Sequence, residues 1–387
     1  MSSTAPTSLR SATEDKFFNS FTETLLSLNA NTYQELVSGK RRGISATALR
    51  TFLGLVEIPY RWAVAHRNRQ FDSGRREIVR VEVPVISVGN LTLGGTGKSP
   101  FVAWIARYLR EQGVRVTIVS RGYGATDGSR NDEALELEQR LPDVPHVQNR
   151  DRVAAARVAI DELDCQAIVL DDGFQHRRLA RDLDIVLLDA CEPFGWKHLV
   201  PRGYLREPPA NLVRAQVVAL SRADVVDAER RQQICAEAKN LAPGALWIET
   251  RHAPEYWLSA SGKELPLGEL KGKRVAALAG IGNPAGFKHT LAGCGLDVVE
   301  FREFPDHHPY GRDDVQSLVA WADKLDVDAV VCTHKDLVKL GVDRLGRRSL
   351  WALVVGLEIL SGRAEFEARL VEAMRPIVER GNSQPGD

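Results

Sequence analysis

The chain has 387 residues, 44% of them hydrophobic and 26% charged, which excludes a disordered protein and leaves room for one or two folded domains. Lys plus Arg and Asp plus Glu each number 51, and a formal net charge of zero argues against a nucleic-acid partner. The five cysteines are scattered and form no C-x-x-C pair, so we expect neither a disulfide framework nor a zinc site.

The first 18 residues lack the apolar core of a signal peptide, and residues 1–30 are predicted to be an N-terminal extension. No apolar run reaches the roughly 18 residues that a membrane-spanning helix needs. We therefore expect a protein that is neither secreted nor integral to a membrane.

Apolar residues recur at spacings of three and four up to position 64, which predicts helices. The clearest stripe consists of Leu49, Phe52, Leu53, Val56, Tyr60 and Val64. Residues 40–80 also contain ten basic residues against three acidic ones. This combination is typical of a helix lying on an anionic bilayer, and it fits equally a helix that packs its apolar stripe on the core. The sequence leaves both interpretations open.

From residue 83 onward, short apolar runs that end in Gly, Ser or Asp alternate with helical stretches. The runs cover 83–88, 114–120, 167–171, 185–189 and 217–221. This alternation predicts an α/β fold with a mostly parallel sheet between helices. In such sheets ligands bind beyond the carboxyl ends of the strands.

The pattern of apolar and polar residues changes after residue 241. Alternating residues at 246–249 and 256–258 predict two strands, and the α/β rhythm then returns with a final helix at about 363–380. We therefore predict a phosphate-loop core over 31–241, a two-stranded linker over 242–270 and a smaller α/β domain over 271–387.

The most specific motif follows the first apolar run. The sequence passes through glycines into Gly97-Lys98-Ser99 and then into a helical segment, as a phosphate-binding loop does, with Thr92 where the strict pattern has its first glycine. Backbone N–H groups of such a loop surround phosphate oxygens, the lysine reaches the β and γ phosphates, and the hydroxyl after it binds Mg²⁺. The predicted nucleotide-binding residues are Thr92, Leu93, Gly94, Gly95, Thr96, Gly97, Lys98 and Ser99.

Paired acids end a later apolar run. Asp171 and Asp172 follow Ile168-Val169-Leu170, the position from which a Walker-B strand helps to hold Mg²⁺. The polar loop that continues through Gln175 and His176 belongs to the same predicted edge. We expect this loop to be functional rather than a solvated turn.

Other polar segments follow predicted strands. Arg121, in Ser-Arg-Gly-Tyr-Gly, is placed to meet a phosphate, whereas Asp132 alone is best explained as a helix cap. Residues 201–208 are rigid, basic and aromatic, which suits an anionic or sugar-like partner and equally a surface turn. In 304–310, the adjacent histidines allow a general base, metal ligands or a solvated turn; without Cys or a third His, a structural metal site is disfavoured.

These segments together resemble a known family. The ordered runs VPVISVGNLTLGGTGKSP, SRGYG, NDE, DDGFQHRRLARDLDIVLLDA, PRGYLREP, GIGNP, FPDHHPY and THKDLVKL are similar to the tetraacyldisaccharide 4'-kinases of lipid A biosynthesis, over about residues 33–340. The resemblance implies ATP-dependent phosphorylation of the 4'-hydroxyl of an acylated disaccharide 1-phosphate lipid. It places the chain as a peripheral protein on the cytoplasmic face of the bacterial inner membrane, bound through the basic helical region and without an obligate protein partner.

The resemblance also implies roles for individual residues. Asp132 acts with His307 on the attacking hydroxyl, and Lys98 keeps its role at the phosphates. The Mg²⁺ ligands it implies are Ser99, Glu133, Asp171 and Asp172. The residues it assigns to the lipid substrate are Arg121, Gln175, His176, Arg206 and Glu207. The family usually has Thr at position 99, and the residues flanking Asp132-Glu133 differ from its pattern.

One alternative function comes from another class of protein. Nucleotide-gated membrane switches and metal-delivery ATPases have a similar phosphate loop, and the adjacent histidines at 307 and 308 favour that interpretation. Many such switches have lysine immediately before the two glycines, where this chain has Leu93. That difference favours the kinase.

Overall fold

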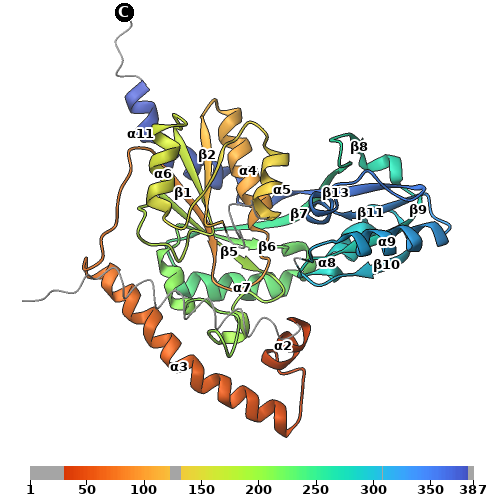
Figure 1. The fold of residues 1–387 in the computed structure, drawn as a ribbon. Coiled ribbons are helices and arrows are strands. Elements are labelled where there is room, and N and C mark those ends of the chain that lie inside the picture. Colours follow the sequence, from red (N-terminus) through yellow and green to blue (C-terminus); the bar gives the residue numbers. More distant parts are fainter. Residues whose placement is uncertain (1–29, 123–131, 307, 382–387) are drawn as a thin grey trace, which may run out of the picture. The chain divides into compact units, whose positions relative to one another are not determined.

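The computed structural model describes residues 30–122, 132–306 and 308–381 (Figure 1). Contacts within the chain define two compact units. The first unit contains the chain up to Arg75 together with Leu91–Leu93 and Glu192–Asn211. The second contains Arg76–Asn90, Gly94–Cys191 and everything from Leu212 onward.

The first unit is built on two helices, α2 (Ala30–Val37) and α3 (Ile44–Asp72). Its small core joins residues of both helices to aromatic side chains of the 192–211 segment. This core comprises Tyr33, Leu36, Val37, Ala46 and Leu53, with Trp196 and Tyr204 packed against it. The rings of Tyr33 and Tyr204 stack with centroids 5.6 Å apart. The segment therefore folds onto the helices through aromatic contacts.

The predicted helix is present as α3, and only part of its recurring apolar stripe is buried. Its buried residues are Ala46, Leu53, Glu57, Val64, Asn68 and Phe71. Of the predicted stripe, Leu53 and Val64 are buried, whereas Leu49 and Phe52 are exposed. The buried stripe differs from the recurring apolar residues because two polar side chains, Glu57 and Asn68, complete it by hydrogen bonding to the 192–211 segment. None of the described helices is long and apolar enough to span a membrane.

In the second unit, the described residues form one sheet of 13 strands. In chain order the strands are β1 (Val85–Asn90), β2 (Val116–Ser120), β3 (His146–Gln148), β4 (Ala167–Asp171), β5 (Leu183–Asp189), β6 (Val217–Ser221), β7 (Leu246–Leu258), β8 (Glu264–Pro266), β9 (Arg274–Ala279), β10 (Asp297–Glu303), β11 (Ala329–Thr333), β12 (Arg344–Leu345) and β13 (Arg348–Ser361). The main path runs β10-β9-β11-β13-β7-β6-β5-β1-β4-β2-β3, with β12 on β13 and β8 on β7.

The sheet consists of two parallel parts joined by one antiparallel pair. Strands β1 to β6 and the start of β7 are parallel neighbours, as are β9, β10, β11 and β13. The two parts meet where β7 and β13 pair antiparallel, from Glu249 with Ser361 to Leu258 with Ala352. The predicted α/β class with a mostly parallel sheet is confirmed.

The linker region differs in detail from the prediction. Both alternating runs, 246–249 and 256–258, lie on the single strand β7, and the second strand of this region is the short β8. One strand spans both runs because β13 pairs with it past Pro254, where the register shifts. The predicted division into domains stays a prediction.

Helices of the second unit follow the strands along the chain. They are α4 (Lys98–Glu111), α5 (Asp132–Arg140), α6 (Arg152–Asp161), α7 (Ala228–Leu241), α8 (Pro284–Gly293), α9 (Arg312–Lys324), α10 (His334–Leu340) and α11 (Arg363–Gly381). Although α11 ends the predicted smaller domain, its Phe366 packs against Phe101 and Trp104 of α4. The last helix therefore shares the core that lies behind the phosphate loop.

Candidate active site

The predicted phosphate loop connects the buried strand β1 to helix α4. Gly94 and Gly97 have φ values of +96° and +82°, a backbone region that favours glycine. Helix α4 begins at Lys98 directly after this turn, so its first N–H groups and Ser99 stand at the carboxyl end of β1. The loop begins in the first unit, where the Leu93 N–H donates to the Tyr204 carbonyl at 2.7 Å.

Lys98 lies among oxygen atoms at this edge. Its ammonium group is 3.4 Å from Asn90 Oδ1 and 3.6 Å from Asp172 Oδ1. Asp171 ends β4 beside Val88 of β1, and its side chain is buried. Opposite charges thus meet at the carboxyl ends of two neighbouring strands, the position where parallel sheets bind ligands.

Backbone packing fixes the segment after Asp172. A Cβ atom on Gly173 would lie 2.4 Å from Ser87 Oγ, and one on Gly89 would lie 2.6 Å from Phe174 Cβ. The loop therefore approaches β1 more closely than residues with side chains allow. Gln175 then donates from Nε2 to the Asn90 carbonyl at 2.9 Å.

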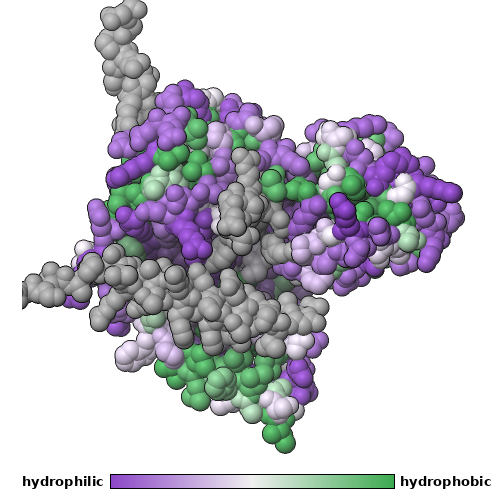
Figure 2. Space-filling model, viewed as in Figure 1, coloured by the Kyte–Doolittle hydropathy of each residue, from purple (hydrophilic) through white to green (hydrophobic). Residues whose placement is uncertain are grey.

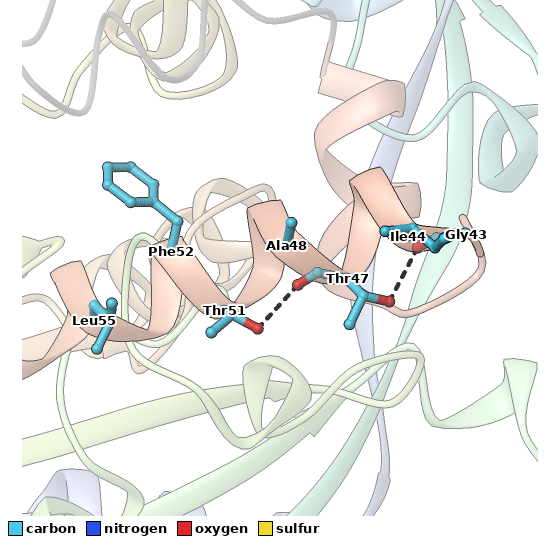
Figure 3. A pocket seen from close by; sticks show the side chains of 7 residues that line it. All are labelled: Gly43, Ile44, Thr47, Ala48, Thr51, Phe52 and Leu55. Carbon is cyan, nitrogen blue, oxygen red and sulfur yellow. Dashed lines mark hydrogen bonds between the residues drawn. The ribbon is translucent and has the colours of Figure 1, made fainter.

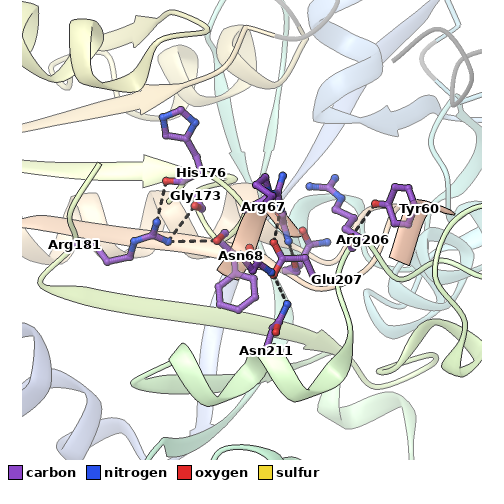
Figure 4. Close-up of polar contacts among 12 residues, drawn as sticks. Tyr60, Arg67, Asn68, Gly173, His176, Arg181, Arg206, Glu207 and Asn211 are labelled. Atoms are coloured by element: carbon purple, nitrogen blue, oxygen red, sulfur yellow. Dashed lines mark hydrogen bonds and ion pairs between the residues drawn. The ribbon is translucent and has the colours of Figure 1, made fainter. Parts of the chain in front are cut away.

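Arg181 holds the same loop from the other side (Figure 4). Its guanidinium donates to the carbonyls of Gly173 at 3.2 Å and His176 at 2.8 Å, and to Asp184 Oδ2 at 3.0 Å. Burial lowers the pKa of His176 to about 3, assisted by the positive charges of Arg152 and Arg181. His176 is therefore neutral at pH 7, and its ring can form hydrogen bonds without adding a charge to this edge.

The residues predicted for proton transfer are only partly described. Asp132 and Glu133 form the first turn of α5, and their side chains lie outside the described residues, as does all of His307. The ring of the neighbouring His308 packs against two aromatic rings, with its centroid 4.9 Å from that of Phe304 and 5.0 Å from that of Tyr310. Arg121 directly follows β2 and is half-buried. The structure therefore leaves the arrangement of these side chains around Lys98 as a prediction.

Arg206 and Glu207 belong to the first unit. Glu207 is completely buried and accepts hydrogen bonds from Arg67 at 2.7 Å, Asn211 at 2.8 Å and Asn68 at 3.4 Å (Figure 4). The Tyr60 hydroxyl donates to the Arg206 carbonyl at 2.8 Å. What the structure shows for Glu207 is the attachment of its segment to α3, and its substrate contact stays a prediction.

Asp336, which the sequence analysis did not assign, joins three segments at the carboxyl edge of β9 and β11. Its carboxylate is completely buried and accepts from the Gly280 N–H at 3.0 Å, the Tyr310 hydroxyl at 2.9 Å and the Thr333 hydroxyl at 2.6 Å. Burial raises the pKa of this carboxyl group. The available sequence signal was Thr333 three residues before Asp336, the spacing of a helix cap.

Oxygen donors at the first edge suit a hard cation. Ser99 and Asp171 supply a hydroxyl and a carboxylate, the ligand types that Mg²⁺ uses beside phosphate oxygens. Within residues 30–122, 132–306 and 308–381, no three His, Cys, Asp or Glu side chains gather into a metal cluster. A site completed by a nucleotide phosphate fits this set better than a cage made only of protein groups.

The parallel sheet, the glycine turn, Lys98 and the paired carboxylates define a phosphate-loop nucleotide-binding protein of the α/β class. A family model described as Tetraacyldisaccharide-1-P 4'-kinase matches residues 49–375. The chain belongs to this tetraacyldisaccharide 4'-kinase family.

Individual relatives agree with the family match. A tetraacyldisaccharide 4'-kinase of Anaeromyxobacter dehalogenans (strain 2CP-C) is 42% identical over 82% of this chain and 88% of its own length. A tetraacyldisaccharide 4'-kinase of Halothermothrix orenii is 35% identical over 84% of this chain and 92% of its own length. The crystal structure of LpxK from Aquifex aeolicus in complex with ATP is 30% identical, covers 84% of this chain and 99% of its own, and superposes with a TM-score of 0.67. These relatives give no support to the membrane switch or metal-delivery ATPase.

Proposed function

We propose that this chain transfers the γ-phosphate of ATP to the 4'-hydroxyl of a tetraacylated disaccharide 1-phosphate, giving the 4'-phosphorylated lipid A precursor. The observation that carries this proposal is Lys98 beside Asp172 at the mouth of a phosphate loop, in a chain of this kinase family. Membership of the family supports the disaccharide lipid as the phosphate acceptor, and the phosphate loop supports ATP as the phosphate donor.

Phosphoryl transfer needs positioning and neutralisation of charge more than covalent chemistry. The loop's N–H groups and the N-terminus of α4 hold the phosphates, and Lys98 moves its charge from Asp172 to the transferred group. Mg²⁺, when bound by Ser99 and Asp171 with help from Asp172 and Glu133, supplies electrostatic stabilisation of the phosphate oxygens. Arg121, Gln175 and neutral His176 donate to phosphate or sugar oxygens at the same edge.

The proposed base is Asp132, polarised by His307. A carboxylate at the start of α5 accepts the proton of the 4'-hydroxyl as transfer proceeds. Helix α5 also contacts α10, where His334 Nε2 lies 2.8 Å from Gln139 Oε1. Asp132→Asn and His307→Ala are each expected to lower kcat at least about 100-fold with ATP affinity retained. Wild-type turnover in either folded variant contradicts the assignment.

The direct test measures transfer of labelled γ-phosphate from ATP to tetraacyldisaccharide 1-phosphate in detergent micelles. We expect labelled lipid with the wild type and none above background with Lys98→Ala. Thermal unfolding of Lys98→Ala provides the control for folding, and Lys98→Arg, which keeps the charge but changes the shape of the cationic group, tests whether charge alone is enough. ATP hydrolysis without labelled lipid would instead support the nucleotide-gated switch.

The acceptor lipid makes a membrane contact necessary, and we assign this contact to α3. Five of its exposed apolar side chains follow one helical stripe: Ile44, Phe52, Leu55, Ile58 and Trp62 are 91%, 58%, 62%, 53% and 75% exposed. Figure 2 shows hydrophobic residues gathered where Figure 1 draws α3, and Figure 3 shows Ile44, Phe52 and Leu55 lining one shallow pocket. Arg61 and Arg69 are exposed on the same helix. An exposed apolar stripe with arginines is the composition of an interfacial helix.

The membrane proposal is tested with vesicles containing anionic lipid. Phe52→Ser with Leu55→Ser removes apolar contact, and Arg42→Glu with Arg69→Glu reverses charge at two exposed arginines. Each pair is expected to weaken vesicle binding at least about fivefold, since each basic residue near an anionic surface contributes about 1 kcal/mol. Nucleotide affinity should not change. Vesicle binding equal to the wild type in both pairs would rule out α3 as the contact.

A further inference from the structure

Two buried polar side chains face the turn that precedes Lys98. A Cβ atom placed on Gly97 would lie 2.4 Å from His252 Nε2 and 2.8 Å from Ser221 Oγ. Ser221 is the last residue of β6, and His252 lies on β7, the next strand of the sheet. The back of the phosphate loop therefore rests on side chains from two adjacent strands.

Ser221 Oγ and His252 Nε2 both lack a hydrogen-bond partner in the described part of the chain. Ser221 is completely buried, and its hydroxyl has no hydrogen-bond partner among the described residues. His252 Nε2 is buried and equally unpartnered within the same residues. The hydroxyl of Thr96, immediately before Gly97, shares this condition. Buried polar groups are normally paired, so three unpaired ones at a single turn indicate that their partners arrive in another state of the loop.

The chemistry of both groups suits backbone partners. Burial lowers the pKa of His252 to about 4, with the positive charges of Arg222 and Arg140 adding to the effect. A neutral imidazole has one donor and one acceptor nitrogen, and a serine hydroxyl both donates and accepts. Each group can therefore bond to an N–H or to a carbonyl of the loop without introducing a charge beside the phosphates.

We propose that Ser221 and His252 form a latch that fixes the phosphate loop in its nucleotide-bound shape. When phosphate draws the loop's N–H groups inward, the backbone around Gly97 shifts and bonds to Ser221 Oγ and His252 Nε2. Both are positioning residues, because they act on the loop rather than on the reacting atoms. The inference rests on the proposed function only in requiring that a nucleotide binds this loop.

The latch also connects the nucleotide to the second part of the sheet. His252 pairs with Leu357 of β13, within the antiparallel pair that joins the two parallel parts. A shift of the loop against His252 is therefore transmitted to the strands that lead to α10 and α11. In this way, occupancy of the loop and the position of the second part become linked.

The experiment measures the affinity of a non-hydrolysable ATP analogue by calorimetry, and thermal unfolding without nucleotide, on the full chain. Ser221→Ala, which removes one oxygen atom, and His252→Gln, which keeps a donor and an acceptor, are compared with Thr250→Val. Thr250 is completely buried on β7, and its hydroxyl already donates to the Leu220 carbonyl at 3.2 Å. It controls for loss of a buried hydroxyl from the strand that neighbours Ser221.

We expect Ser221→Ala to weaken analogue binding about tenfold while leaving the Tm without nucleotide unchanged or higher, because it deletes an unsatisfied group. His252→Gln should weaken binding less than His252→Ala. Thr250→Val should lower the Tm and spare affinity. Wild-type affinity in both Ser221→Ala and His252→Ala overturns the latch, as does a loss of Tm in Ser221→Ala equal to that of Thr250→Val. Absence of analogue binding by the wild type would overturn the proposed function instead.

Discussion

The two parallel parts of the sheet differ in how the polar groups at the carboxyl ends of their strands are paired. At the edge of β1 and β4, Lys98 lies 3.4 to 3.6 Å from its oxygen neighbours, and the hydroxyls of Thr96 and Ser221 have no partner among the described residues. At the edge of β9 and β11, Asp336 is completely buried and accepts three hydrogen bonds of 2.6 to 3.0 Å. The first edge keeps long contacts that a ligand can replace, whereas the second is closed.

This difference shows how one kind of topology serves two purposes. Carboxyl ends of parallel strands always bring loops together, but the polar groups placed there decide whether the loops bind a ligand or hold one another. The Asp336 carboxylate accepts its hydrogen bonds from Gly280, Tyr310 and Thr333, so it holds protein segments together. Through Tyr310 it also supports the segment that contains position 307.

The sharpest way to separate the edges is one chemical change made at both. Asp171→Asn is expected to lower kcat about 10² to 10³-fold, because a neutral amide binds Mg²⁺ poorly and charge stabilisation in the transition state is lost. Its Tm should stay within a few degrees of the wild type. Steady-state kinetics and thermal unfolding on the same preparation provide both values. A kcat near that of the wild type would remove Asp171 from the metal site.

Asp336→Asn makes the same change at the closed edge, and we expect the opposite outcome. The amide oxygen can accept from two of the three donors, and the NH2 group then faces the Thr333 hydroxyl, which donates to the carboxylate, so the loss of stability should be about 2 kcal/mol. Denaturant unfolding measures this loss, and calorimetry should find nucleotide affinity unchanged. If affinity falls while stability holds, Asp336 belongs to the binding edge and the contrast between the edges is lost.

The strands and the phosphate loop could be predicted because their signals are local. Each apolar run and the glycines before Lys98 report on their own backbone, and these elements lie where the sequence placed them. Buried partners from distant segments could not be found in this way. Glu57 looks like a solvated helical acid, yet it accepts the Leu199 N–H at 3.0 Å and completes the buried stripe of α3.

Arg67 shows that the sequence does not tell a surface arginine from one that pairs with a buried carboxylate. It belongs to the basic region that suggested a membrane surface, but its guanidinium is bonded to the buried Glu207 at 2.7 Å. Reversing its charge would therefore break a buried pair as well as alter the surface. Arg61 likewise pairs with the buried Glu57 at 2.7 Å, so the exposed Arg42 and Arg69 are the residues of this region suited to a vesicle-binding test. Separating the two kinds of arginine required the contacts of the fold.

The cap of α10 offers a smaller perturbation of the closed edge. Thr333 Oγ1 donates to Asp336 Oδ2 at 2.6 Å and accepts from the Asp336 N–H at 3.2 Å. Thr333→Ala should cost about 1 kcal/mol, the usual cost of losing a helix cap, and Thr333→Ser should recover most of it. Equal stability of the two variants in denaturant unfolding would show that the hydroxyl contributes nothing.

The smallest expected effect is a change in pH dependence at the open edge. His176 has a folded pKa of about 3, below the 6.5 of an unfolded histidine, so the unfolded chain binds the extra proton. Its contribution to stability is therefore present above pH 6.5 and is lost as the pH falls from 6.5 toward 3. His176→Gln, which cannot titrate, should make the Tm decline less steeply in that window, by at most roughly 2 °C at pH 5. The same substitution at an exposed histidine of α3, His66→Gln, provides the matched control. A slope unchanged by His176→Gln would mean that the ring is open to protonation in the fold, and the loop after Asp172 would then be as accessible as the nucleotide edge beside it.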